Sequence, residues 1–235
     1  MPADNPVTLD VIARIRTEFP EKFGIPRQSG LAPHSQARII FEEKYRNAEA
    51  LRGIEGFEYL WLIWEFSENR RDTWSPTVRP PRLGGNARLG VFATRSPFRP
   101  NPIGLSSVRL EKIEVLPEEG MTIVVSGADL MDGTPIYDIK PYLPYTDAHP
   151  DAKAGFAPVP DKTIEVRVPP ELLERIPENR RQALFEVLAQ DPRPSYRPDG
   201  DHIYGLFFAG FNVCFQVREQ VLTVCSVDRI QEKTA

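Results

Sequence analysis

Short runs of alternating apolar and polar residues dominate the first two thirds of the chain and predict a series of β-strands. Residues 7–16 place an apolar side chain at every second position, which is the period of a half-buried strand. Residues 58–66 are dense in aromatic and β-branched side chains and predict a buried strand. Further strands are predicted at 38–41, 89–94, 107–116 and 121–127. The 107–116 strand keeps its apolar residues on one face only if a bulge shifts the register near Glu111.

The pattern changes near residue 150. Residues 146–160 are rich in Pro, Ala and Asp and predict a linker, after which a strand is expected at 163–168. A helix is predicted from Pro177, a residue favoured at the first helical position, to about Gln190. Three closely spaced strands follow at 203–208, 211–217 and 221–227. Because no regular βαβ alternation occurs, we expect a mainly β protein, with an antiparallel sheet or barrel in residues 1–150 and a small α+β unit in 151–235.

The composition is that of a folded soluble protein, with 235 residues of which 41% are hydrophobic and 26% charged. The longest unbroken apolar run, Tyr59 to Trp64, is far shorter than the roughly 20 residues of a membrane helix. The first residues carry no basic-then-apolar signal, and two cysteines cannot form a disulfide scaffold or a zinc site. We therefore expect a cytoplasmic protein without a membrane or metal partner.

The charge is unevenly distributed. The net charge is −4, yet residues 73–110 contain six arginines and no Lys, Asp or Glu, while the rest of the chain carries 23 basic and 33 acidic side chains. Arginine suits planar, bidentate contacts with phosphate or carboxylate groups. This segment therefore predicts contact with an anionic partner, and the alternative is that its arginines pair with the acidic surplus elsewhere in the fold.

The densest motif is GVFATRSPFRPNPIGLS at residues 90–106. Its three prolines fix three φ angles and exclude a central strand, so the segment predicts a stiff loop. Such a loop presents Arg95, Arg99 and Asn101 and loses little entropy when it binds a ligand. The alternative is a Pro-rich corner in which the Asn caps a turn.

Three further motifs carry polar residues on Pro- or Gly-containing segments. In SGADLMDGTPIYDIKPYLP, at residues 126–144, Asp138, Lys140 and Tyr142 alternate and predict either a polar pocket wall or a surface ion pair. The loop FGIPRQSG at 23–30 is also fixed by a proline. In AQDPRPSY, at 189–196, Arg193 and Tyr196 could pair with and stack on a nucleotide, or simply cap a helix end.

Several common catalytic motifs are absent from the sequence. It contains no G-x-G-x-x-G or Walker loop, no H-E-x-x-H and no G-x-S-x-G. The three histidines are scattered, which favours surface positions over metal ligation.

Taken together, these motifs resemble the TsaA-like family, whose bacterial members are called TrmO. PRQ at 26–28, the RPNPIGLS and DGTP–DIKPYLP blocks and AQDPRPSY carry the resemblance, which extends from about Val7 to the C-terminal strands. It implies an S-adenosylmethionine-dependent tRNA methyltransferase that methylates the exocyclic nitrogen of N6-threonylcarbamoyladenosine next to the anticodon. It also implies a β-barrel catalytic domain, which differs from the Rossmann-like fold, and a homodimer.

The resemblance also assigns residues. The S-adenosylmethionine site is expected to comprise Pro26, Arg27, Gln28, Ser67, Glu68, Arg95, Leu105, Ser126, Gly127, Ala128 and Asp129, where Ser67 and Glu68 replace an expected His-Gln-like pair. A carboxylate such as Asp129 favours the sulfonium or the ribose hydroxyls, and an Arg suits the methionine carboxylate. Candidate tRNA contacts are Arg88, Arg99, Asn101, Lys140, Arg193 and Tyr196. Asp138 or Tyr142 is the candidate proton acceptor, and the sequence does not choose between them.

Two other functions fit parts of the pattern. The first is a non-catalytic RNA- or nucleotide-binding barrel whose arginines bind phosphate. The second is a small-molecule hydrolase with Asp138 and Lys140 as its working pair.

Overall fold

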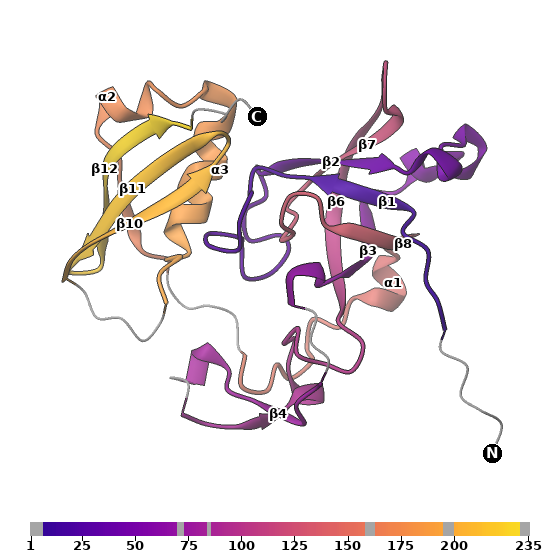
Figure 1. The fold of residues 1–235 in the computed structure, drawn as a ribbon, viewed down its shortest axis with the longest axis horizontal. Coiled ribbons are helices and arrows are strands. Elements are labelled where there is room, and N and C mark those ends of the chain that lie inside the picture. Colours follow the sequence, from indigo (N-terminus) through magenta and orange to yellow (C-terminus); the bar gives the residue numbers. More distant parts are fainter. Residues whose placement is uncertain (1–6, 70–72, 84–85, 158–162, 195–199, 231–235) are drawn as a thin grey trace.

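The computed structural model describes residues 7–69, 73–83, 86–157, 163–194 and 200–230. Figure 1 shows three parts: a β-barrel on the right, a small α+β domain in orange and yellow on the left, and an excursion that carries β4 below them. The fold class expected from the sequence, a mainly β protein with a small C-terminal α+β domain, is confirmed.

Six antiparallel strands form the closed barrel, in the order β1-β2-β7-β6-β3-β8. They are β1 (Ala13–Arg16), β2 (Gln36–Phe41), β3 (Tyr59–Glu65), β6 (Ile103–Leu116), β7 (Gly120–Ser126) and β8 (Pro135–Pro141). Their inward side chains, among them Ile15, Ile39, Leu62 and Ile123, form one buried cluster. The predicted strand at residues 7–16 is wrong before Ala13, because only Ala13–Arg16 pair with β2.

The predicted bulge is confirmed. The β6–β7 register shifts between Leu110 and Lys112, so Glu111 is the extra residue. The shift places Leu110 and Ile113 together against the barrel core, whereas Val115, close to the turn between β6 and β7, is 73% exposed. Ser126 Oγ on β7 donates to Glu111 Oε1 at 2.5 Å, which ties the bulge to the end of the neighbouring strand.

Residues 66–102 leave the barrel between β3 and β6 and form the excursion (Figure 1). It contains short 3₁₀-helices at Ser67–Asn69 (η4), Pro81–Leu83 (η5) and Val91–Ala93 (η6), and the paired strands β4 (Thr77–Val78) and β5 (Leu89–Gly90). The strand predicted at 89–94 is therefore wrong after Gly90. Thr94 turns the chain there, since its backbone N and its Oγ1 both donate to the Val91 carbonyl.

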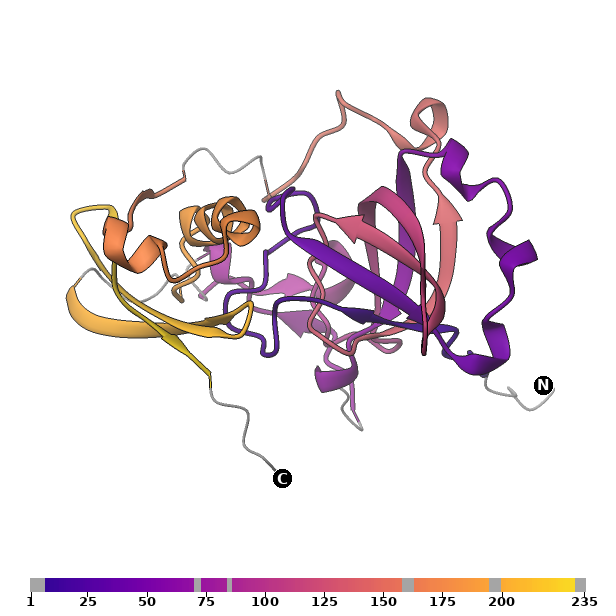
Figure 2. The same ribbon diagram turned by 90° about the horizontal axis from the view of Figure 1, so that it is seen from above.

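Between β2 and β3 the chain forms three 3₁₀-helices, at Glu43–Tyr45, Ala48–Leu51 and Ile54–Gly56, and α1 (Pro144–Asp147) follows β8. The C-terminal domain is a four-stranded sheet in the order β10-β11-β12-β9, with two helices. Its elements are β9 (Glu165–Arg167), α2 (Pro170–Leu173), α3 (Glu178–Ala189), β10 (Gly200–Phe208), β11 (Phe211–Arg218) and β12 (Val221–Arg229). Figure 2 shows α3 across one face of this sheet, where its buried residues join the strand residues in a second core.

The segment between β1 and β2, residues 17–34, packs into this second core although it belongs to the N-terminal part of the sequence. Phe19 lies 5.8 Å from Phe208, ring centroid to ring centroid, and Phe23 stacks on Tyr204 and Phe215. Polar contacts add to this packing. Glu18 pairs with Arg180, and His34 pairs with Glu186. The Leu31 carbonyl accepts a hydrogen bond from the Gln190 side-chain amide. The segment therefore holds the PRQ motif between the barrel and the C-terminal domain.

No helix in the described parts of the chain is both long and apolar enough to span a membrane.

Candidate functional site

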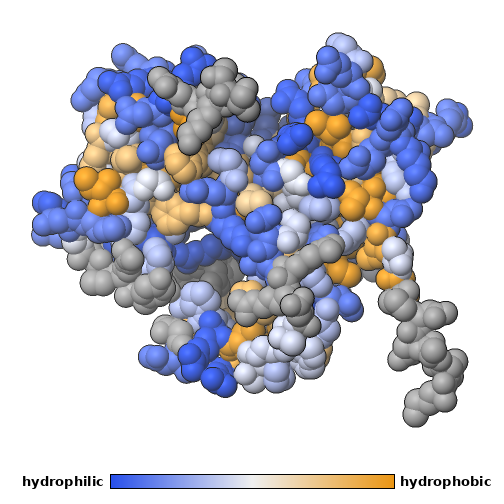
Figure 3. All heavy atoms as spheres, viewed as in Figure 1, coloured by the Kyte–Doolittle hydropathy of each residue, from blue (hydrophilic) through white to orange (hydrophobic). Residues whose placement is uncertain are grey.

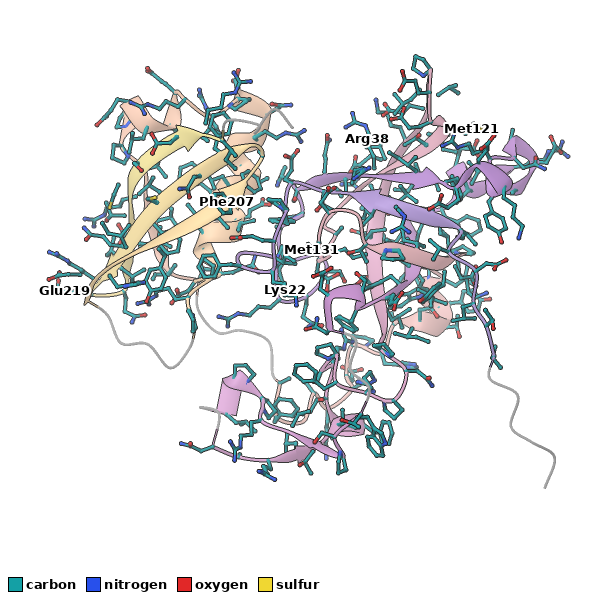
Figure 4. All side chains as sticks on the ribbon, in the orientation of Figure 1. Lys22, Arg38, Met121, Met131, Phe207 and Glu219 are labelled. Atoms are coloured by element: carbon teal, nitrogen blue, oxygen red, sulfur yellow. The ribbon has the colours of Figure 1, made fainter. Side chains whose placement is uncertain are left out.

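A cavity of about 490 Å³ lies where the barrel, the excursion and the 17–34 segment meet. Its lining residues are Lys22, Ile25, Pro26, Arg27, Gln28, Trp64, Glu65, Phe66, Ser67, Glu68, Asn69, Thr94, Arg95, Arg99, Ile103, Gly104, Leu105, Asp129, Met131 and Thr134. Figure 4 labels Lys22 and Met131, which lie at this junction above the excursion. Figure 3 shows the surface hollowed between the C-terminal domain and the excursion, with many hydrophilic side chains around it.

Asp129 is held in this cavity by a short chain of hydrogen bonds. Trp64 Nε1 donates to Ser106 Oγ at 3.0 Å, and Ser106 Oγ donates to Asp129 Oδ1 at 2.5 Å. Burial raises the pKa of Asp129, although the Ser106 hydrogen bond and the Arg95 charge act in the opposite direction. A carboxylate that is poorly solvated and held in one orientation favours a bound cation or a pair of hydroxyl donors.

Glu65 is a second carboxyl group in the cavity. It ends β3, is 4% exposed, and its Oε2 accepts a hydrogen bond from the Tyr137 hydroxyl at 2.6 Å. Glu65 is not among the residues predicted from the sequence, because residues 58–66 indicate a uniformly buried strand. The available signal was a single acidic residue near the end of the apolar run EYLWLIWEF.

The PRQ loop is fixed on both sides. Arg95 donates to Gln28 Oε1, and the Gln28 amide nitrogen donates to the carbonyl of Arg27. Arg27 Nη2 reaches the carbonyls of Asp191 and Arg193 at 3.0 and 3.4 Å. Arg27 and Gln28 therefore connect the PRQ loop to the 90–106 motif and to the 189–196 motif, which are far apart in the sequence.

Three of the expected cofactor residues, Ser126, Gly127 and Ala128, do not line the cavity. Their segment instead contacts the backbone next to the PRQ loop. Gly30 N donates to the Gly127 carbonyl at 2.8 Å, and Gly127 N donates to the Ser35 carbonyl at 3.0 Å. Gly127 has φ +75°, a backbone conformation that residues with a side chain rarely adopt, so glycine is favoured at this position. The expected cofactor segment thus splits into a supporting part, 126–128, and a cavity residue, Asp129.

The other expected cofactor residues, Ser67, Glu68 and Leu105, line the cavity with Arg99. Lys22 Nζ donates to the Glu68 carbonyl at 2.9 Å and so ties the excursion to the 17–34 segment. Arg99 Nη1 donates to the carbonyls of Thr94 and Ser96, at 2.8 and 3.4 Å, which fixes its guanidinium at the cavity edge. The predicted stiff loop therefore presents Arg95 and Arg99 toward one space.

The two proton-acceptor candidates do not line the cavity. Asp138 is partly exposed, pairs with Lys140 at 2.9 Å and accepts the Ile139 backbone N–H. Tyr142 packs against Trp61 and hydrogen-bonds through its backbone N to the Tyr59 carbonyl, at the far end of β3. Tyr59 lies six positions before Glu65 in β3, so the rise along a strand places that end about 20 Å from the cavity.

The candidate tRNA contacts are dispersed. Arg88, Asn101 and Lys140 are exposed and lie outside the cavity lining. Arg193 is 7% exposed and holds Asp191 with two bonds of 2.8 Å, which favours a structural role for this side chain. Tyr196 lies outside the described residues.

The cavity residues without a sequence-based assignment include Lys22, Trp64, Glu65, Thr94, Met131 and Thr134. In the described ranges, no group of three or more His, Cys, Asp or Glu side chains could hold a metal ion.

Comparisons with known proteins identify the family. A family model described as the tRNA-methyltransferase O N-terminal domain matches residues 14–148, and one described as the TrmO C-terminal domain matches residues 161–230. The chain belongs to the TrmO family. Within it, the chain is 42% identical over 226 residues to a tRNA (adenine(37)-N6)-methyltransferase of Escherichia coli K12, an alignment that covers 92% of this chain and 96% of the relative.

Two further TrmO relatives come from Pseudomonas aeruginosa. A putative S-adenosylmethionine-dependent methyltransferase named RcsF is 43% identical over 203 residues, which is 83% of this chain and 86% of that protein. A crystal structure of TrmO superposes with a TM-score of 0.79 at 34% identity and covers 97% of this chain and 100% of the other. The likeness to TrmO thus includes both domains.

Proposed function

We propose that this chain is an S-adenosylmethionine-dependent tRNA (adenine(37)-N6)-methyltransferase that acts on N6-threonylcarbamoyladenosine. The observation that carries the proposal is the cavity: the PRQ, RPNPIGLS and DGTP motifs that resemble the TrmO family all contribute residues to its lining, and the family match extends over both domains. The alternative hydrolase receives no such support, because Asp138 and Lys140 form an exposed ion pair outside the cavity lining.

The cavity suits S-adenosylmethionine in size and chemistry. Its volume of about 490 Å³ falls in the range of pockets that enclose a cofactor-sized molecule. Asp129 offers a carboxylate to a sulfonium or to ribose hydroxyls, and Arg95 and Arg99 offer guanidinium groups to an amino-acid carboxylate. Ile25 and Met131 add apolar surface for a heterocycle.

When bound, S-adenosylmethionine supplies an electrophilic methyl group on a sulfonium. The chain contributes orientation: the stiff 96–102 loop, the PRQ loop and the Trp64–Ser106–Asp129 hydrogen bonds hold their groups in place before binding. Placing two reactants in line converts a bimolecular step into an effectively unimolecular one and supplies much of the barrier reduction.

Calorimetric titration with S-adenosylmethionine tests the cofactor part of the proposal. We expect saturable binding at one site per chain, together with an increase in melting temperature, because a ligand that binds only the folded state stabilises it. The absence of both heat and a thermal shift would contradict the proposal and favour the non-catalytic RNA-binding alternative.

The acceptor nitrogen must lose its proton when the methyl group arrives. Asp138 and Tyr142 stay sequence-based candidates for the acceptor, but the cavity geometry favours Glu65. In single-turnover methylation of threonylcarbamoylated tRNA, we expect Glu65→Gln to slow the reaction by about 100-fold or more, as loss of a general base does. The Gln side chain keeps the size of Glu, and its amide oxygen can still accept a hydrogen bond from the Tyr137 hydroxyl.

The matched control is Asp138→Asn, for which we expect a rate within about two-fold of wild type, since surface ion pairs contribute little. A large rate loss for Asp138→Asn together with a normal rate for Glu65→Gln would reverse this assignment.

We also infer a homodimer that acts in the cytoplasm, and a division near residue 150 in which residues 151–235 contact tRNA or support the dimer. The family resemblance supports the homodimer, and the cysteine-poor composition supports the cytoplasmic location. The packing of residues 17–34 into the C-terminal core places the C-terminal domain next to the cavity loops, which supports a tRNA contact there.

A further inference from the structure

The excursion exposes two large aromatic side chains side by side. Trp74 is 50% exposed and Phe92 is 71% exposed, and their rings stack with centroids 6.1 Å apart and planes inclined by 29°. A single exposed aromatic residue is common on a protein surface, whereas adjacent, mutually stacked rings form a contiguous apolar surface of the kind found at interaction sites. We refer to these two residues as the aromatic pair.

The aromatic pair lies beside the cavity. Phe92 belongs to η6, and Thr94 and Arg95, which follow it directly in the chain, line the cavity. The Arg99 guanidinium carbon lies 6.0 Å from the centroid of the Phe92 ring, and Arg99 lines the cavity as well. One arginine thus connects the aromatic pair to the space where the reaction is proposed to occur.

The surrounding charge selects the kind of partner. Residues 73–110 contain arginine as their only charged residue type. An acidic protein surface would satisfy these arginines but would offer no flat π-surface to Trp74 and Phe92. An unpaired nucleotide offers both, because its base stacks on aromatic rings and its phosphates pair with guanidinium groups.

We propose that Trp74 and Phe92 form a stacking platform for an unpaired base of the tRNA anticodon loop that neighbours the methylated nucleotide, and that Arg99 fixes the edge of this platform. The inference rests on the proposed function, since it is that function which brings an anticodon loop to the cavity. The platform holds the loop while the modified adenosine enters the cavity.

Binding of threonylcarbamoylated tRNA by the full-length chain tests this proposal. We expect Trp74→Ala and Phe92→Ala each to weaken tRNA binding by about ten-fold, the effect of removing one base–aromatic stack. Phe92→Tyr keeps an aromatic face and should stay within about two-fold of wild type. The slope of tRNA affinity against salt concentration should not change, because no phosphate contact is lost.

Two controls separate stacking from general damage. The affinity for S-adenosylmethionine and the melting temperature should be those of wild type in both alanine variants, since neither ring belongs to a buried core. Tyr145→Ala removes an aromatic side chain that is 87% exposed on α1 and should leave tRNA binding unchanged.

The outcomes are distinct. If wild type binds and methylates tRNA while both alanine variants bind it normally, the platform is wrong and the proposed function stands. If the alanine variants instead lose a dimer seen for wild type by sedimentation, and tRNA binding does not change, the patch is covered by a second copy of the chain and the platform is wrong. If wild type neither binds nor methylates tRNA, the proposed function and the platform are both wrong.

Discussion

The variant Gly104→Ala is expected to lose S-adenosylmethionine binding and to melt at a lower temperature than wild type. A Cβ at position 104 would lie 2.3 Å from Trp64 Cε2 and 2.4 Å from Cζ2, well inside contact distance. The indole cannot yield easily, because Trp64 is largely buried and its Nε1 donates to Ser106. Displacing it breaks the hydrogen bonds that orient Asp129, and overpacking of this kind lowers the free energy of unfolding by about 1–3 kcal/mol.

A thermal melt and a cofactor titration check this expectation. Gly56→Ala is the control, since a Cβ at position 56 meets no atom within 4 Å. In the double variant Gly104→Ala with Trp64→Phe, the smaller ring makes room for the added methyl group and should recover part of the lost stability. A normal melting temperature and normal cofactor affinity for Gly104→Ala would show that Trp64 does not organise the cavity.

The second large effect is expected from Asp129→Asn, which should weaken S-adenosylmethionine binding by about 100-fold, within the range for removing one partner of a buried charge pair. The loss should be smaller for S-adenosylhomocysteine, whose sulfur is neutral, if the carboxylate serves the sulfonium. It should be equal for the two ligands if Asp129 serves the ribose hydroxyls. Unchanged affinity for both would remove Asp129 from the cofactor site.

Although Asp129→Asn should weaken cofactor binding, it should increase the free energy of unfolding at neutral pH. Because burial raises the pKa of Asp129, the folded state binds a proton there more readily than the unfolded state. Ionisation therefore lowers the stability of the folded protein as pH rises from the ordinary carboxyl pKa through the raised one. Relative to wild type, Asp129→Asn should gain stability at neutral pH and gain none in acid, and a series of melts across pH measures this difference. If Asp129 had a purely structural role, Asp129→Asn would be less stable than wild type at neutral pH.

Local alternation predicted the strands well where each strand pairs along its length. The break in alternation at Glu111 was sufficient to predict the bulge, because one extra residue is the only local change that returns both halves of β6 to the same face. Residues 7–12 also alternate, yet they form no strand, because the register with β2 ends at Ala13. Alternation reports which way side chains point, and it does not report how far a partner strand extends.

The cavity residues that lie on loops could be predicted from the sequence more readily than those that lie on strands. The prolines around Arg95 and Arg99 made a rigid loop evident, and the structure places both side chains at one cavity. Asp138, Lys140 and Tyr142 do share an extended segment, but period two cannot tell how far along the barrel each of them lies from the cavity. The paired register of β3 and β8 distinguishes the two ends of the barrel. Trp64 lies opposite Ile136 at the cavity end, next to Glu65, whereas Trp61 lies opposite Lys140 toward the other end.

The packing of residues 17–34 against the C-terminal core could not be inferred from local sequence. Phe19 and Phe23 give no periodic signal, and their partners, among them Phe208 and Phe215, lie almost 200 residues away in the chain. Contacts of such separation depend on the whole fold. They explain why Arg27, expected to face the cofactor, also donates to the carbonyls of Asp191 and Arg193.

The most direct test of the central claim is methyl transfer from S-adenosylmethionine to two preparations of the same tRNA, one with and one without the threonylcarbamoyl group on adenosine 37, analysed by mass spectrometry of the nucleosides. We expect the wild-type chain to add one methyl group to N6-threonylcarbamoyladenosine in the first preparation and to leave the second unchanged. Absence of transfer to the modified tRNA at saturating cofactor, or equal transfer to both preparations, would contradict the account.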